Sequence, residues 1–452
     1  MTAEKVHRFN SPVVAMPMWS NFIGGDLRDG YRRAAMRFLV DTTPLRVSRD
    51  FRRLWIGQAV SVFGTTVTTA ALPFQVFEQT GSSLAVGLLG AAELGPLLVC
   101  AVVGGSFADR VDKRRLLLGV TAISLLCSGT LAVNAYLDHP QLWLMYVVGA
   151  VASGVTAISF ATMRSLLPLL LEQDLRPAGF ALQSTYTTLG WMAGPAVAGV
   201  LIGSFGLTSA YATDVATFVV ALVAFVGIAP SPPISTAVGT ARESLVTGLR
   251  FLGGHRVILS VFAIDLVAMV FGMPRALFPA LADRLGGGPV LYGLLLSSVA
   301  AGGFLASLGS GWTTRVRRQG RALLIAVAVW GVCIAAAGLA VQPVLVLALF
   351  VCAGGADMVS AVFRSTIAAN LTPDDMRGRV SGVEFAVYAG GPVLGDVESG
   401  VVGGLAGVPF AIVSGGIACV IAAGIFAARV RGLATYRTTR RRDAYISSAA
   451  PS

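Results

Sequence analysis

The chain has 452 residues, of which 55% are hydrophobic and 13% are charged, and its mean hydropathy is +0.75. This apolar share exceeds that of soluble globular proteins, so soluble enzymes are excluded and a membrane protein is predicted. The net charge of +11 is then expected to reflect membrane topology, and no nucleic-acid partner is predicted.

Twelve apolar segments recur along the chain, each close to the roughly 20 residues that a helix needs to cross a bilayer. We expect an all-α membrane protein with spans at residues 53–77, 83–107, 115–137, 141–163, 179–203, 207–229, 256–280, 290–313, 321–341, 343–366, 379–404 and 408–429. Lysine and arginine collect in cytoplasmic connections. With both termini inside, all but two of the 34 basic residues, Arg275 and Arg284, fall on that side. A multi-pass protein of the inner (cytoplasmic) membrane is predicted.

The connections divide the chain into five parts, of which the first has no apolar run of signal-peptide length and is expected to be mobile. The central part begins with prolines, and its second portion, "ARESLVTGLRFL", can form a short amphipathic helix. The parts are a cytoplasmic N-terminal segment at 1–49, a six-helix bundle at 50–229, a cytoplasmic linker at 230–255, a second six-helix bundle at 256–430 and a basic cytoplasmic tail at 431–452.

The two six-helix parts resemble each other in sequence. Arg164 and the serine after it recur as Arg364 and its serine, and Gly194-Pro195 recurs as Gly391-Pro392. Internal repeats of this kind are a common plan of transporters, which hold substrate near the midplane between the halves. The repeat predicts a transporter that works by alternating access.

The connection after the second span, "GGSFADRVDKRR", concentrates charge in an otherwise apolar chain. It resembles the major facilitator superfamily signature G-x-x-x-D-R-x-x-R-R at Gly105, Asp109, Arg110, Arg114 and Arg115. The resemblance implies twelve transmembrane helices in two pseudo-symmetric six-helix bundles, the major facilitator fold.

In that superfamily the signature loop acts as a conformational lock between the halves. Asp109 can face the positive N-terminal end of the eleventh helix, near Arg377, and Arg164 is a second candidate partner. The alternative for the basic residues of the loop is that they only enforce topology.

The fifth span carries "GWMAGPAVAG", which is similar to the antiporter signature of the superfamily except that Ala198 replaces one glycine. The matching residues are Gly190, Gly194, Pro195 and Gly199. Small residues at this spacing allow close helix contact, and the resemblance implies export. Generic small-residue packing is the alternative.

Further stretches, "FRRLWIGQAVS", "ALPFQVF", "GLRFL" and "RALFPALADRLGG", resemble the enterobactin exporter-like branch of the superfamily. That branch exports siderophores and other small amphipathic molecules. The resemblance implies an outward direction of transport and leaves the cargo open.

Four acids, Glu93, Asp265, Asp357 and Asp396, lie near the middle of predicted spans. An acid at the bilayer centre costs roughly 2.5–3.5 kcal/mol, so such residues face a cavity or carry a proton. No basic residue is expected at their depth. They are candidates for proton coupling or for attracting a cationic cargo, with Asp265 and Asp357 preferred for the proton; the alternative is a carboxylate bonded to Ser or Thr. Asp214 is interpreted as structural.

Polar side chains of span one, and aromatic side chains of spans five and eleven, are candidate cavity contacts, although threonines often bond to their own helix. The fourth span lacks the mid-membrane arginine of drug–proton antiporters, which departs from that pattern. The candidate contacts are Gln58, Thr65, Thr69, Gln75, Tyr186, Trp191, Phe385 and Tyr388.

No phosphate-binding G-x-x-x-x-G-K-[ST] run is present, the three histidines fall in polar stretches and the five cysteines in apolar ones. We therefore expect no enzyme, cofactor or metal site, and a proton gradient as the energy source. The favoured function is secondary export of a small amphipathic molecule, siderophore-like or another secondary metabolite, by proton antiport. A broad-specificity drug efflux pump is the alternative, and a non-transporting sensor or scaffold a weaker one. The chain is taken as a monomer by default.

Overall fold

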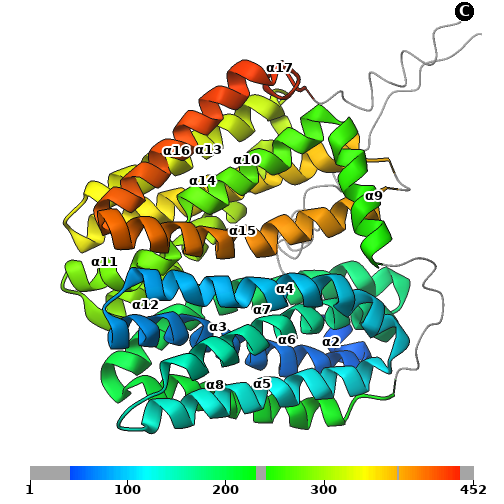
Figure 1. Ribbon diagram of the computed structural model, residues 1–452. Helices are drawn as coiled ribbons and strands as arrows, with labels where there is room; N and C mark the ends of the chain where they lie inside the picture. The colour runs from blue at the N-terminus through cyan, green and yellow to red at the C-terminus, as the bar shows by residue number, and fades with distance from the viewer. Residues whose placement is uncertain (1–40, 231–240, 374–375, 438–452) are drawn as a thin grey trace, which may run out of the picture.

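The computed structural model describes residues 41–230, 241–373 and 376–437, without the side chains at 102–103, 105–110, 241–245 and 385. The described chain is helical throughout (Figure 1). The first half comprises α2 (Thr43–Val47), α3 (Arg49–Thr80), α4 (Ser83–Arg110), α5 (Lys113–Tyr136), α6 (Leu142–Leu170), η1 (Gln173–Leu175), α7 (Arg176–Phe205) and α8 (Leu207–Val226).

A linker helix, α9 (Ala241–Gly254), precedes the second half. The second half comprises α10 (Arg256–Gly272), η2 (Arg275–Leu277), α11 (Phe278–Arg284), α12 (Gly288–Leu308), η3 (Ser310–Arg315), α13 (Gln319–Leu339), α14 (Pro343–Leu371), α15 (Arg377–Ala406), α16 (Val408–Arg429) and α17 (Arg431–Ala434). The amphipathic helix expected in the linker is therefore present as α9.

Within the described residues, eleven helical segments are long and apolar enough to cross a membrane. α15, which carries Glu384, Asp396 and Glu398, is not among them. It packs against α4, α10 and α16 and completes the twelve-helix fold. The predicted all-α fold with twelve long helices is confirmed.

The two halves repeat one packing scheme. In the first half α3 packs on α7 and α8, α5 on α6 and α8, and α4 on α6; in the second half α10, α12, α13, α14, α15 and α16 repeat these pairs in the same order. The halves meet through α4 against α15 and through α7 against α12, two contacts that a twofold relation exchanges. Figure 1 shows α4 and α15 side by side along this boundary.

Local sequence explains several helix ends. Ser48 and Asp112 cap α3 and α5 by accepting the N–H groups of Phe51 (3.1 Å) and Arg115 (2.9 Å). Gly206 and Gly407 make the turns from α7 to α8 and from α15 to α16 with φ of +82° and +89°, which side-chain-bearing residues rarely adopt. The same turn thus recurs in both halves.

The seventh span differs from its prediction as one helix over 256–280. α10 ends at Gly272, and η2 and α11 follow after a break at Met273 and Pro274. Proline lacks an N–H and disfavours helical backbone in the residue before it, so the chain turns here. A short helix at Thr43–Val47 was also not predicted.

The molecule has two distinct ends. The end that carries α11, Gly206 and Gly407 is called the α11 end, and the opposite end, with α2, α9 and α17, the α9 end (Figure 1).

Candidate functional site

The two halves share a hydrophobic core at the α11 end. One continuous cluster of buried residues includes Val67 and Leu89 of the first half together with Leu277 and Leu295 of the second. Toward the α9 end, the buried residues form four smaller clusters, each confined to one half or to the second half and α9. The described side chains therefore join the halves at one end and form separate cores at the other.

Glycines make this closure tight where α4 crosses α15. A Cβ placed on Gly87 would lie 2.9 Å from the carbonyl oxygen of Asp396, and one on Gly400 would lie 2.7 Å from the Cα of Gly87. Such distances leave no room for a side chain, so the two backbones are in direct contact.

The antiporter-like glycines of α7 contact two different helices. A Cβ on Gly190 would lie 2.9 Å from a methyl of Val62, and one on Gly194 would overlap Thr66, so both face α3 of their own half. Gly199 instead faces α12, where an added Cβ would lie 3.2 Å from the Cα of Gly293. Pro195 lies inside α7 and is buried. Only the last glycine of the motif therefore lies at the boundary between halves.

An ion pair lies beside the α4–α15 crossing. The guanidinium of Arg275 donates to the carboxylate of Asp396 at 2.6 Å, and the two side chains are 25% and 17% exposed. Glu93 of α4, in the other half, interacts electrostatically with both residues and points toward Gly149 of α6. One basic and two acidic groups thus face each other across the boundary.

A second ion pair is buried inside the second half. Arg364 of α14 donates to Asp265 of α10, and these side chains are 9% and 5% exposed. Asp357 lies two turns before Arg364 on the same face of α14 and interacts electrostatically with it. Glu384 of α15 is a further electrostatic neighbour of Asp265. Three helices therefore bring a mixed group of charges together.

The expectation that these acids have no basic partner is wrong for Asp265 and Asp396. Arg364 was placed at the end of span ten, but α14 continues to Leu371, which puts Arg364 about 10 Å inside the helix. Arg275 was assigned to an outer connection, but the break at Pro274 directs it to α15. For Glu93 and Asp357 the expectation holds among the described residues, in which neither forms an ion pair.

Asp214 is satisfied without any basic residue. It is 1% exposed, and its carboxylate accepts the hydroxyls of Ser128 (2.6 Å), Thr68 (2.7 Å) and Thr217 (3.3 Å). These bonds join α3, α5 and α8. The contacts agree with the structural interpretation.

The polar candidates of α3 do not form one ligand-facing row. Gln75 is 1% exposed and accepts the hydroxyl of Tyr211 at 2.7 Å, and Gln58 is also buried. Thr69 is exposed, but its hydroxyl donates to the carbonyl of Thr65 at 2.7 Å. The bond within the helix, the alternative left open by the sequence, is the one observed.

The aromatic candidates are also separated. Tyr186 is buried against Trp55, with ring centroids 6.2 Å apart, whereas Trp191 and Tyr388 are 45% and 63% exposed. The Tyr388 hydroxyl interacts electrostatically with members of both charge groups, Asp357, Arg364 and Arg275. The side chain of Phe385 lies outside the described residues.

The signature loop is described only in part. The side chains of Gly105, Asp109 and Arg110 lie outside the described residues. Arg114 donates to the carbonyl of Val226 at 2.6 Å, at the negative end of α8 in its own half.

Arg115 of the same loop is exposed, and Arg164 lies over the ring of Phe160 at 5.8 Å. These placements leave the proposed lock untested.

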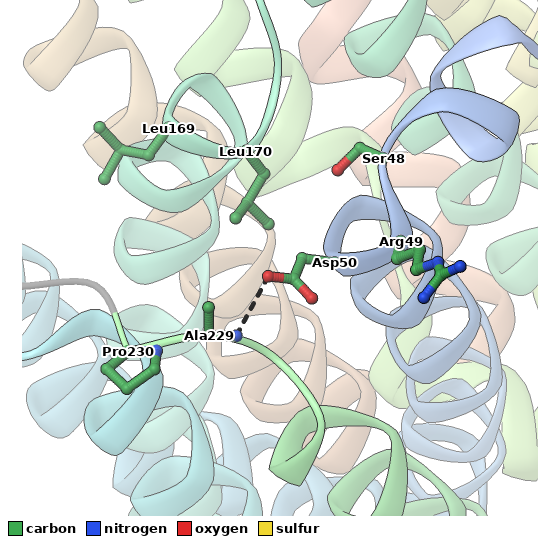
Figure 2. Close-up of a pocket in the computed structure, with 7 residues that line it drawn as sticks. All are labelled: Ser48, Arg49, Asp50, Leu169, Leu170, Ala229 and Pro230. Atoms are coloured by element: carbon green, nitrogen blue, oxygen red, sulfur yellow. Dashed lines mark hydrogen bonds between the residues drawn. The ribbon is translucent and has the colours of Figure 1, made fainter.

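A surface pocket lies at the α9 end of the first half. Figure 2 shows Asp50 directed at Ala229, whose N–H it accepts at 3.1 Å, while Arg49 points away from the pocket. The remaining lining residues are Ser48, Leu169, Leu170 and Pro230. Because all of them belong to the first half, this pocket is not part of a path between the halves.

Three comparisons with known proteins agree. The transmembrane secretion effector family model matches residues 41–440. The enterobactin exporter EntS of Shigella boydii serotype 18 is 27% identical over 380 residues, covering 81% of this chain and 88% of that protein.

Two solved structures share the fold. A bacterial homologue of the human lysosomal transporter Spinster, in an inward-facing and unoccupied conformation, has a TM-score of 0.66, 15% identity and coverage of 86% of this chain and 98% of that one. The nucleoside transporter NupG has a TM-score of 0.66, 13% identity and coverage of 84% and 98%.

These matches establish a multi-pass membrane protein that moves a small-molecule substrate, and they confirm the prediction that the chain is not an enzyme. The chain belongs to the transmembrane secretion effector family, a family of secondary transporters of the major facilitator superfamily.

Proposed function

We propose that the protein exports a small amphipathic molecule across the inner membrane by alternating access. The observation that carries this proposal is the shared core at the α11 end against the separate cores at the α9 end. Basic residues concentrate at the α9 end, so that end faces the cytoplasm and both termini lie there. The conformation described is then inward-facing, ready to load cargo from the cytoplasm.

Two sequence similarities support the outward direction of transport. The glycine motif of α7 resembles that of exporters, and the curated relatives of the chain include the enterobactin exporter EntS. The same relatives, which are bacterial, support an inner-membrane location. A monomer is sufficient, because the path lies between the two halves of one chain.

Coupling to protons is proposed at Asp357 and Glu93. Neither acid has an ion-pair partner among the described residues, so each can gain or lose a proton without breaking a pair. Asp265 and Asp396 contribute to proton coupling through their ion pairs with Arg364 and Arg275. One proton crossing 100 mV supplies about 2.3 kcal/mol.

The charge balance favours a cationic or neutral amphiphile over an anionic siderophore. The acids around the path outnumber Arg275 and Arg364, and Tyr388 adds an exposed aromatic face that can stack on a cation. Broad drug efflux is therefore the second candidate function.

Transport in everted membrane vesicles tests the proposal, because their bath contacts the cytoplasmic face. With an acidic interior, vesicles that carry the protein should accumulate ethidium faster than vesicles without it, and collapse of the pH gradient with nigericin should abolish the difference. Uptake that survives nigericin would contradict proton antiport. Transport of a catecholate siderophore but not ethidium would favour the siderophore function.

Unchanged gradient dependence in Asp357→Asn, Glu93→Gln and Asp265→Asn would remove these acids from the coupling mechanism. Comparison of culture medium from cells with and without the protein would identify the natural cargo.

A further inference from the structure

A hydrogen bond crosses the boundary between halves at the α11 end. The hydroxyl of Tyr292, in α12, donates to the backbone carbonyl of Ala70, in α3, at 2.8 Å. Tyr292 is 1% exposed and Ala70 is 2% exposed, so neither group has water as an alternative partner in this conformation. A buried donor or acceptor that loses its partner is costly, which makes this bond specific to the closed arrangement.

The surroundings of Tyr292 hold its ring in place. The ring packs on Phe74 of α3 with centroids 5.3 Å apart, and the next residue, Gly293, contacts the backbone of α7 at Gly199. One turn of α12 is thus inserted against two helices of the other half. Any separation of the halves at the α11 end must withdraw it.

A proline lies in the same turn of α3 as the acceptor. Pro73 has no N–H to donate to the carbonyl of Thr69, so one helical hydrogen bond is missing next to Ala70. A backbone carbonyl at a proline turn is accessible to a donor from outside its helix. The tyrosine hydroxyl supplies that donor.

We propose that the Tyr292 hydroxyl is a latch that holds the α11 end closed by its bond to the Ala70 carbonyl. The latch acts beside Arg275 and Asp396, close enough for the charges of that pair to reach the hydroxyl. Tyr292 is a positioning residue, because it sets the balance between the state open at the α9 end and the state open at the α11 end and contacts no cargo. The inference rests on the proposed alternation between these states.

A matched control exists in the same fold. Tyr211 is also fully buried and donates its hydroxyl to α3, at Gln75 (2.7 Å), but both groups belong to the first half. Tyr292→Phe and Tyr211→Phe therefore delete equivalent bonds, one across the boundary and one within a half. Phenylalanine keeps the ring, so both variants retain their packing.

Double electron–electron resonance measures the latch directly. Spin labels are placed on Gln79 at the end of α3 and on Leu405 at the end of α15, both exposed, in a cysteine-free protein in lipid nanodiscs. Tyr292→Phe should raise the ratio of long to short distances about twofold to tenfold, the range of one net hydrogen bond. Tyr211→Phe should leave the distance ratio unchanged. It should lower the unfolding temperature about as much as Tyr292→Phe does, because each variant loses one buried hydrogen bond.

An unchanged distance ratio in Tyr292→Phe, or an equal shift in both variants, would overturn the latch. The experiment contains no cargo and no gradient, so it separates the latch from the transport proposal. Vesicles that fail to transport while the ratio shifts would reject the function and retain the latch.

Discussion

The two halves share their packing but differ in how they treat buried charge. In the first half, Asp214 is held by two hydroxyls from neighbouring helices, those of Thr68 and Ser128, and by that of Thr217 on its own helix. In the second half, Asp265 is held by Arg364, and Asp396 by Arg275. Among the described residues, both halves thus have the same helix packing, but the buried ion pairs lie only in the second half.

Equivalent positions make the contrast sharper. Arg164 and Arg364 occupy matching places in the repeat, yet Arg164 is exposed over an aromatic ring whereas Arg364 is buried. Gln58 is the tenth residue of α3 and Asp265 is the tenth residue of α10. The first half offers an amide where the second offers a carboxylate, so only the second half can build the pair. We expect the buried ion pairs of the second half, together with Glu93 of the first half, to carry the charge-dependent step.

The largest expected effect comes from breaking the buried pair. Arg364→Gln leaves Asp265 buried without its counter-charge, which should lower the free energy of unfolding by about 3–5 kcal/mol. Arg164→Gln is the control from the other half, with an expected change within about 0.5 kcal/mol because its side chain is exposed. Thermal unfolding in detergent compares the two; equal losses would remove the asymmetry between the halves.

A medium effect is expected from the glycines of α7. Gly194→Ala overpacks the contact with Thr66 inside the first half and should lower the free energy of unfolding by about 1–3 kcal/mol. Gly199→Ala overpacks the contact with α12 between the halves and should instead shift the conformational balance away from closure at the α11 end.

The spin-label distance across the α11 end, together with the unfolding temperature, distinguishes these two results. If Gly199→Ala lowers the unfolding temperature but leaves the spin-label distance unchanged, Gly199 does not control closure between the halves.

The smallest changes in stability are expected at two acids that have no ion-pair partner among the described residues, Asp214 and Asp357. Asp214→Asn weakens hydroxyl bonds and should cost about 1–2 kcal/mol without changing the dependence of transport on the pH gradient. Asp357→Asn should leave stability within about 0.5 kcal/mol, since no pair is lost, but abolish that dependence. Vesicle transport at matched protein levels provides the test, and loss of the gradient dependence in Asp214→Asn would make Asp214 part of the coupling mechanism.

Much of the fold followed from the sequence. Apolar runs and small-residue turns located all twelve long helices to within several residues, because lipid demands long apolar helices whatever they pack against. The seventh span was the exception: its apolar run continues through Pro274, whereas helical geometry does not. Pro274, which disfavours helical backbone at Met273, was the missed signal.

The site was less predictable, because its contacts join residues distant in the chain. The glycine motif identified Gly199 at the boundary, but nothing in the order of residues showed that Arg275 reaches Asp396 or that Tyr292 reaches Ala70. The internal repeat offered one clue for Arg364. Arg164 and Arg364 lie at matching places in α6 and α14, and both helices continue beyond the end of the apolar run, so each arginine lies within its helix.

We propose that a path runs from the cytoplasmic α9 end to mid-depth between the halves. Tyr388 is 63% exposed and lies about 17 Å along α15 from Arg377, near the middle of that helix. In a cysteine-free background, Tyr388→Cys should react with a membrane-impermeant maleimide in everted vesicles and not in intact cells. Reaction in intact cells but not in everted vesicles would contradict the account.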